Sequence, residues 1–309
     1  MTMDYVLQTF DLTKKYGRQM AVNGANMNIC RGDIYGFVGE NGSGKTTIIR
    51  LITGLIMPQS GSYRLFGVEN TDPKIGQVRR LMGAVVETPS IYRNMSAKDN
   101  LLMQAKILGI EDEEKIRATL EIVGLGYLYE ENKKASNFSL GMRQRLGIAM
   151  ALLGDPQFLI LDEPMNGLDP AGIVEVRELI LRLNQQHGIT FLISSHILSE
   201  LSLVANKYGI ISKGKILKEI TAQEFHDSCG KHLMLQVQDP QALMSLAMTL
   251  LPGYPVSYIE GGVKITGDVD LNQFLKAVID SGNQIFAVNC SETGFEEYYL
   301  SVLGGGVNA

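Results

Sequence analysis

The sequence predicts an α/β fold with a mostly parallel sheet, followed by a smaller α+β domain. Short apolar runs at 158–161 and 190–194 have the length and composition of buried parallel strands, and the segment 171–186 between them is an amphipathic helix. A glycine-rich turn links the apolar run 34–38 to a helix-like segment at 47–55. Strands that alternate with helices in this way form parallel sheets.

The first part of the chain is expected to be rich in strands. Residues 5–28 contain β-like runs, and a Gly-Asp turn at 32–33 precedes the strand that leads into the glycine-rich turn. Further strands are predicted at 61–67 and 81–86.

A helical insert interrupts this α/β framework. Ser96 suits a helix N-cap, and acidic residues lie in the first turn of the helix that follows the next loop. Helices are predicted from Ser96 to residue 108, at 111–123 and at 142–153. We expect these helices to form a helical subdomain at about residues 88–155.

Residues 220–309 have a different character, with ten acidic against three basic residues and a net charge of −7, whereas residues 1–219 carry +2. The predicted elements are a helix at 222–228, a strand at 232–237, a helix at 241–251, a hairpin turning at 261–262, a helix at 271–281, a strand at 285–289 and a helix at 294–303. The middle follows a βαββαβ order, as in ferredoxin-like domains. The sequence here has no glycine-rich turn like that at 39–46, no nucleophile constellation and no metal-ligand cluster. We interpret 220–309 as an accessory domain for dimer contact or regulation, with a ligand sensor as the alternative.

Composition excludes several classes of protein. With 309 residues, 45% hydrophobic and 20% charged, the chain is long enough for two globular domains. A net charge of −5 argues against a nucleic-acid-binding protein. Cys30, Cys229 and Cys290 have no paired spacing, which favours reduced thiols over disulfides or a zinc site. The most apolar window, 146–153, is shorter than the roughly 20 residues of a membrane-spanning helix. The N-terminus lacks a secretory signal, so we expect a cytosolic chain.

The glycine-rich turn, Gly39-Glu-Asn-Gly-Ser-Gly-Lys-Thr, predicts the phosphate loop of a P-loop NTPase. Its glycines permit backbone conformations in which successive N–H groups converge on phosphate oxygens, at a helix N-terminus whose dipole favours anions. Lys45 adds a positive charge at the β- and γ-phosphates, and the Thr46 hydroxyl is placed for Mg²⁺. The expected nucleotide contacts are Gly39, Glu40, Asn41, Gly42, Ser43, Gly44, Lys45, Thr46 and Thr47.

A second nucleotide motif follows the apolar run 158–161. Asp162 falls at the carboxyl end of a predicted strand, where α/β sheets bind ligands, and Glu163 comes directly after it. Asp162 is expected to hold Mg²⁺ through water, and Glu163 to act as general base on the attacking water. Taken alone, such a pair is more often a solvated loop, so its interpretation depends on the phosphate loop and on the motifs around it.

Five motifs together resemble the ATP-binding cassette (ABC) family. The phosphate loop, the Ser139-x-Gly141 helix start, the Asp162-Glu163 pair, the 166–169 segment and the 194–196 segment occur in that family's order and rough spacing. The resemblance covers residues 5–218. The Ser-x-Gly segment departs from the family's usual signature at the positions between and beside the two retained residues.

The resemblance implies roles for individual residues. Tyr16 corresponds to the aromatic residue that stacks on adenine, with an ordinary strand-face tyrosine as the alternative. Ser139 and Gly141 correspond to the signature motif that contacts the γ-phosphate of ATP on the opposite subunit. Asp169 corresponds to the residue that links the two sites across the dimer, and His196 to the switch histidine at the γ-phosphate.

Glu87 is a departure from the family, which mostly carries glutamine at this position near the metal and the γ-phosphate. An ionised carboxylate cannot donate a hydrogen bond and adds negative charge beside phosphate, so it must contact Mg²⁺ or stay protonated. We expect Glu87 to act both in catalysis and as a metal ligand. Together with residues 88–92, it resembles the branch that exports, or defends against, bacitracin and lantibiotic peptides; an exporter of an unrelated drug or lipid is the alternative.

The resemblance as a whole implies an ATPase that uses ATP and Mg²⁺ to power transport. Each chain has one phosphate loop and one signature segment, so two copies are expected to form a homodimer with two complete sites. The implied partner is a membrane-spanning subunit on a separate chain, with no nucleic acid, and the implied location is peripheral, on the inner face of the cell membrane. The alternative is a soluble ABC-type ATPase of DNA repair or translation. Repair members insert a long coiled coil and translation members fuse two cassettes, and neither feature occurs in this sequence.

Overall fold

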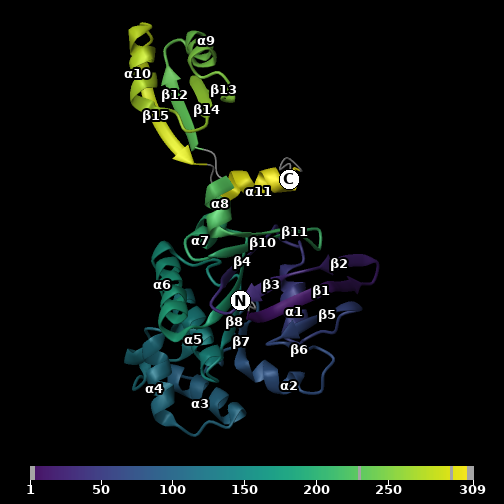
Figure 1. The fold of residues 1–309 in the computed structure, drawn as a ribbon. Helices are drawn as coiled ribbons and strands as arrows, with labels where there is room; N and C mark the ends of the chain where they lie inside the picture. The colour runs from purple at the N-terminus through teal and green to yellow at the C-terminus, as the bar shows by residue number, and fades with distance from the viewer. Residues whose placement is uncertain (1–3, 229–230, 293–294, 305–309) are drawn as a thin grey trace. The chain divides into compact units, whose positions relative to one another are not determined.

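The computed structural model describes residues 4–228, 231–292 and 295–304, in two compact units that divide between Ala222 and Gln223 (Figure 1). The first unit contains β1 (Tyr5–Tyr16), β2 (Gln19–Ala25), β3 (Asn28–Cys30), β4 (Ile34–Val38), α1 (Lys45–Ile52), β5 (Ser60–Leu65), β6 (Val68–Glu69), α2 (Ile75–Val78), η1 (Arg79–Leu81), β7 (Met82–Val85), α3 (Ala97–Leu108), α4 (Glu113–Ile122), η2 (Gly126–Leu128), η3 (Ala135–Asn137), α5 (Leu140–Leu152), β8 (Phe158–Asp162), α6 (Pro170–His187), β9 (Thr190–Ser195), α7 (Leu198–Ser202), β10 (Lys207–Ser212) and β11 (Lys215–Thr221). None of the described helices is long and apolar enough to cross a membrane.

A six-stranded sheet in the order β11-β10-β4-β9-β8-β7 forms the framework of the first unit. Its neighbouring strands are parallel except for the antiparallel β10–β11 pair, as the alternation of strands and helices predicts. Every residue of β4, β8 and β9 is buried, which explains why these strands read as continuous apolar runs. Because the strands are parallel, their carboxyl ends meet at one edge, where the phosphate loop and Asp162 follow β4 and β8.

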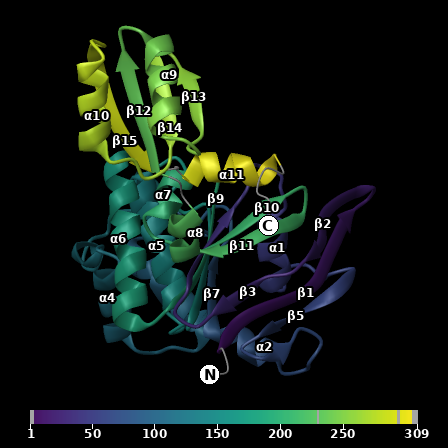
Figure 2. The same ribbon diagram turned by 45° about the horizontal axis from the view of Figure 1, so that its top comes forward.

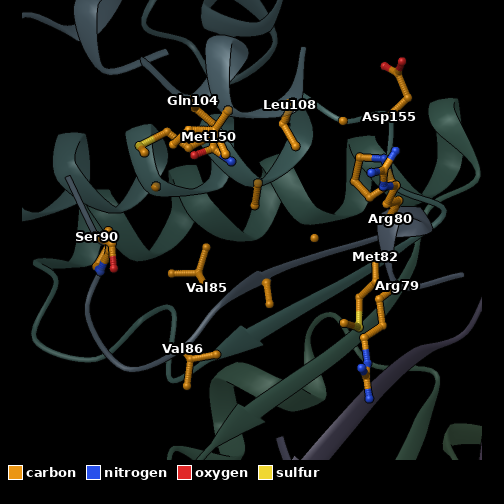
Figure 3. Close-up of a pocket in the computed structure, with 18 of the residues that line it drawn as sticks. Arg79, Arg80, Met82, Val85, Val86, Ser90, Gln104, Leu108, Met150 and Asp155 are labelled. Carbon is orange, nitrogen blue, oxygen red and sulfur yellow. The ribbon is translucent and has the colours of Figure 1, made fainter. Parts of the chain in front are cut away.

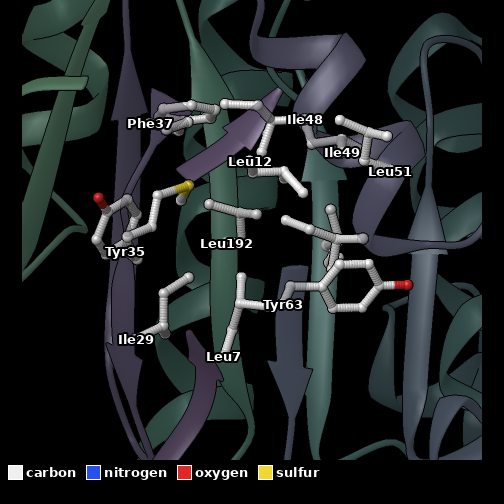
Figure 4. Close-up of a cluster of buried hydrophobic side chains, with 14 of the residues drawn as sticks. Leu7, Leu12, Ile29, Tyr35, Phe37, Ile48, Ile49, Leu51, Tyr63 and Leu192 are labelled. Atoms are coloured by element: carbon white, nitrogen blue, oxygen red, sulfur yellow. The ribbon is translucent and has the colours of Figure 1, made fainter. Parts of the chain in front are cut away.

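A second, antiparallel sheet packs on this framework. It has the order β2-β1-β5-β6, with β3 paired to β1. Figure 4 shows Leu7 and Tyr63 from this sheet and Leu192 of the parallel sheet in one apolar cluster, which also takes in Ile48 and Ile49 of α1. The helix that follows the phosphate loop is therefore anchored through its apolar face.

The helical subdomain contains α3, α4 and α5, each of which starts at a side-chain cap. Ser96 caps α3 in a reciprocal capping box with Asp99, as expected of an N-cap at Ser96. Asp112 caps α4 and Ser139 caps α5. The helices predicted at 96–108, 111–123 and 142–153 begin and end within two residues of the observed α3, α4 and α5.

Two local predictions differ from the structure. The helix expected at 47–55 is α1, Lys45–Ile52. It ends early because Gly54 adopts a left-handed conformation, φ 78°, which stops the helix. No element is predicted between 195 and 221, where the structure has α7, β10 and β11. β11 is an edge strand rich in lysine, so its apolar pattern is weak.

The second unit contains α8 (Ala222–Ser228), β12 (Lys231–Val237), α9 (Pro240–Leu250), β13 (Val256–Ile259), β14 (Gly262–Thr266), α10 (Leu271–Asp280), β15 (Ile285–Glu292) and α11 (Phe295–Leu303). Its four strands form an antiparallel sheet in the order β13-β14-β12-β15. One cluster of buried apolar side chains joins this sheet to α9 and α10. Figure 2 shows these two helices beside the strands of the sheet. The predicted start of the last helix at 294 and the thiol of Cys229 lie outside the described residues.

Candidate nucleotide-binding site

The phosphate loop lies between β4 and α1 and is shaped by its glycines. Gly42 and Gly44 have φ angles of 80° and 113°, which other residues rarely adopt. A β-carbon on Gly39 would lie 2.5 Å from the carbonyl oxygen of Ile211 and 2.6 Å from Ser43 Oγ, so no larger residue fits there. Gly44 precedes α1 without a side-chain cap, which leaves the first N–H groups of the helix for an anion.

Lys45 is buried beneath this loop, with 5% of its surface exposed. Its Nζ donates to the carbonyl oxygens of Gly39 at 2.6 Å and Glu40 at 3.2 Å. The same ammonium lies 3.5 Å from Oε1 of Glu163. The structure therefore brings the predicted phosphate-binding lysine and the predicted base into one ion pair.

Glu163 and His196 form the second part of the site. The Nδ1 atom of His196 donates to Oε2 of Glu163 at 2.6 Å, and the His196 backbone N–H lies 3.3 Å from the same oxygen. Glu163 itself has a φ of 51°, an uncommon conformation for a residue with a side chain. Ser194 supports it by accepting from the Glu163 N–H at 2.9 Å through its hydroxyl oxygen. The side chains of Glu163 and His196 are therefore held together at the end of the sheet.

Asp162 has the environment of a cation ligand. It is 1% exposed, and its Oδ1 accepts from the Ser194 hydroxyl at 2.5 Å. Within the described part of the chain, its other oxygen, Oδ2, is buried with no hydrogen-bond partner, as is Ser43 Oγ in the phosphate loop. A buried carboxylate oxygen without a partner is costly, and a bound cation or its water shell would satisfy it. With the hydroxyl of Thr46, this is the oxygen-rich donor set that Mg²⁺ prefers. The described residues fit the metal in this respect.

Glu87 contacts α1 instead of the other predicted site residues. Its Oε1 lies 2.5 Å from Nη2 of Arg50, in the last turn of α1. Residues Thr88, Pro89 and Ser90 of the following loop line a groove of about 800 Å³ (Figure 3). The remaining groove walls come from α3, α5, β7 and the η1 region, and include the side chains of Arg79, Arg80, Gln104, Leu108, Met150 and Asp155.

The signature residues lie at two adjacent helix starts. Ser139 accepts from the Met142 N–H at 3.1 Å, and Asp169 caps α6 by accepting from the Gly172 N–H at 3.1 Å. A β-carbon on Gly141 would lie 3.8 Å from Cα of Gly172, so these two helix ends lie side by side. Among the described residues, neither Ser139 nor Asp169 hydrogen-bonds to the phosphate loop of its own chain.

Tyr16 ends β1 and is 46% exposed, with the Lys14 ammonium 5.9 Å from its ring centre. One face of the ring is thus accessible for stacking.

Two residues that contact the candidate site are missing from the sequence prediction. Ser194 belongs to the 194–196 motif but receives no role there, although it hydrogen-bonds to both acids of the site. Arg50 belongs to none of the sequence motifs. Its only sequence signal is its position four residues after Thr46, which places both on one helix face.

Several known proteins are similar to this chain. Residues 22–166 match the family described as "ABC transporter". Over 307 residues, covering 98% of this chain and 99% of the relative, the sequence is 43% identical to the bacitracin transport ATP-binding protein BcrA of Bacillus licheniformis. It is 44% identical over 214 residues to the lantibiotic transport ATP-binding protein SrtF of Streptococcus pyogenes, covering 69% of this chain and 90% of that protein. The ADP conformation of MJ1267, an ATP-binding cassette of an ABC transporter, superposes with a TM-score of 0.64 at 26% identity, covering 71% of this chain and 92% of that one.

Proposed function

The chain belongs to the ABC transporter family, as an ATP-binding subunit that hydrolyses ATP, and from this premise we propose that it powers export of, or self-protection against, a peptide antibiotic. The supporting observation is the 43% identity to a bacitracin transport protein along nearly the whole chain, including the C-terminal unit. The acid at Glu87, where the family mostly has glutamine, supports the same branch.

Glu163 is proposed as the general base. It is positioned by His196 and Ser194, and its ion pair with Lys45 is opened when phosphate takes the ammonium. His196 is then proposed to contact the γ-phosphate in addition to the Glu163 carboxylate. In this position it would orient both the general base and the phosphate that reacts.

Thr46 and Asp162 are proposed to hold Mg²⁺, with Glu87 as a third ligand once nucleotide is bound. When present, this ion neutralises charge on the β- and γ-phosphates. The loop N–H groups, Lys45 and the α1 N-terminus supply the rest of the positive potential. Gly39, Glu40, Asn41, Gly42, Ser43, Gly44 and Thr47 are proposed to shape this cradle, and Tyr16 to stack on adenine.

Two copies are proposed to complete each site. Ser139 is exposed and Gly141 is buried at the start of α5, and among the described residues Ser139 makes no hydrogen bond to the chain's own phosphate loop, which suits a role on the nucleotide of the partner. Asp169 at the neighbouring helix start is proposed to connect the two sites.

A separate membrane subunit is proposed to dock at the groove beside residues 88–90, on the cytoplasmic face of the membrane. The groove combines apolar side chains with charged ones that include Arg80, Lys115 and Asp155, so it suits a short amphipathic segment with a charged residue. Its position next to Glu87 would couple docking to the nucleotide.

The domain boundary is proposed at 219–220, and the C-terminal domain is proposed to be ferredoxin-like. Its βαββαβ order and its strand order β13-β14-β12-β15 support this assignment. Dimer contact or regulation is proposed as its role.

Survival of antibiotic-sensitive cells tests the function. Cells that express the chain with its membrane subunit should tolerate bacitracin or a lantibiotic, and the Glu163→Gln variant should remove that tolerance. Tolerance only to an unrelated drug or lipid analogue would refute the peptide substrate. Recovery of the chain with ribosomes or DNA, and not with a membrane protein, would refute the transport role and favour the soluble alternative.

A further inference from the structure

The contact between Glu87 and Arg50 links the loop after β7 to the helix that starts at the phosphate loop. Arg50 Nη2 and Glu87 Oε1 are 2.5 Å apart. Arg50 follows Thr46 by four residues, so both side chains lie on the same face of α1, one helical turn apart. The carboxylate of Glu87 is thus held by a residue that lies one helical turn from the proposed metal ligand Thr46.

This ion pair has the properties of a reversible contact. The side chains of Arg50 and Glu87 are 39% and 58% exposed, and exposed ion pairs are weak and screened by salt. Glu87 also has a φ of 61°, an uncommon conformation for a residue with a side chain, within a loop that follows a short strand. A small rearrangement of the loop would therefore release the carboxylate.

We infer that Arg50 is a positioning residue that holds Glu87 away from the metal and the γ-phosphate until nucleotide binds. Glu87 then has two alternative positions, one on the Arg50 guanidinium and one on the metal. This inference rests on the proposed role of Glu87 as a metal ligand. Only an acid makes the first position an ion pair; a glutamine would accept a much weaker hydrogen bond from Arg50.

Nucleotide binding with and without metal tests this inference. The measurement is the affinity for a fluorescent ATP analogue in the Glu163→Gln background, which slows hydrolysis, and the quantity compared is the ratio of affinities in Mg²⁺ and in EDTA. Arg50→Gln should raise this ratio about two- to fivefold, since it removes the competing partner of the carboxylate. Because salt screens the ion pair, high salt should bring the Mg²⁺-to-EDTA affinity ratio of the protein that retains Arg50 closer to the ratio of Arg50→Gln.

Two controls distinguish a failure of this inference from a failure of the proposed metal role of Glu87. Arg117→Gln removes the same charge from another exposed ion pair, with Glu130 at 3.0 Å, and should leave the ratio unchanged. In a chain that also carries Glu87→Gln, Arg50→Gln should have no effect. An unchanged ratio in Arg50→Gln, or an equal change with Glu87→Gln present, would overturn the inference. If Glu87→Gln alone leaves the ratio unchanged, the proposed metal role of Glu87 fails instead.

Discussion

Replacing Glu163 with glutamine separates its role in chemistry from its role in holding Lys45. The change keeps the size of the side chain and its backbone support from Ser194, but removes the charge that lies 3.5 Å from the Lys45 ammonium. Glutamine also cannot take a proton from water. We therefore expect turnover to fall while ATP binding is retained.

The structure sets the size of both effects. A positioned general base contributes roughly 10²- to 10⁴-fold to the rate, so turnover should fall by about that factor. At 3.5 Å, opposite charges attract by about 5 kcal/mol at an effective dielectric constant of about 20, and desolvation offsets most of it. Because Lys45 keeps its two carbonyl partners, we expect the variant without nucleotide to lose about 1–3 kcal/mol of stability. Phosphate no longer has to displace the carboxylate, so ATP should bind at least as tightly as before.

Phosphate release, binding of a fluorescent ATP analogue, thermal unfolding with and without ATP, and size-exclusion chromatography measure these effects. Glu163→Gln should show a larger thermal shift with ATP than the unsubstituted chain and should accumulate as an ATP-bound dimer. Glu121→Gln, a change to an exposed acid on α4, is the matched control and should behave like the unsubstituted chain. Undiminished ATPase activity in Glu163→Gln would remove Glu163 as the base.

Three further changes test the loop, the base-stacking residue and the C-terminal unit. Gly39→Ala should lower the free energy of unfolding, measured with denaturant, by about 1–3 kcal/mol, because its methyl group would meet the Ile211 carbonyl. Gly42→Ala should lower it by only about 1 kcal/mol, because Gly42 has a φ of 80° but open space around it. Equal losses in the two variants would contradict this reasoning. Tyr16→Ala should weaken ATP binding about fivefold and Tyr16→Phe should not, and equal affinities of all three proteins would exclude stacking. Burial lowers the pKa of His232 below its ordinary 6.5, so the stability it contributes is present above pH 6.5 and is lost as pH falls through the folded pKa. Unfolding of His232→Gln should therefore depend less on pH between 7 and 5, and an unchanged slope would contradict this assignment.

The sequence predicts those parts of the site that depend on local chemistry. The phosphate loop is recognisable because glycines, a lysine and a hydroxyl must occupy fixed positions between a strand and a helix. Asp162 is recognisable because it ends an apolar strand in a chain that also carries the phosphate loop and the motifs around the acid pair. Helix caps such as Ser96 and Ser139 are equally local, so the helices that they start lie close to their predicted bounds.

The parts that sequence analysis misses depend on contacts between distant residues. β11 is an edge strand with two lysines, and it is recognisable as a strand only once it pairs with β10. The ion pairs from Glu87 to Arg50 and from Glu163 to Lys45 join residues 37 and 118 positions apart, and no local pattern specifies either. Both acids also have positive φ angles, which a sequence predicts reliably only for glycine.

These two ion pairs have a common consequence for the catalytic cycle. Without nucleotide, the proposed base is neutralised by Lys45 and the proposed metal ligand Glu87 is neutralised by Arg50. Both basic partners belong to α1, with Lys45 at its start and Arg50 in its last turn, so phosphate bound at the start of the helix would compete with Glu163 for Lys45, and the accompanying Mg²⁺ would compete with Arg50 for Glu87. Binding would then free the Glu163 carboxylate beside His196 and release the loop after β7 that borders the groove. Both changes would use residues that already lie at the site. In this way the same phosphate that is to be hydrolysed would prepare both the reaction and the contact with the membrane subunit.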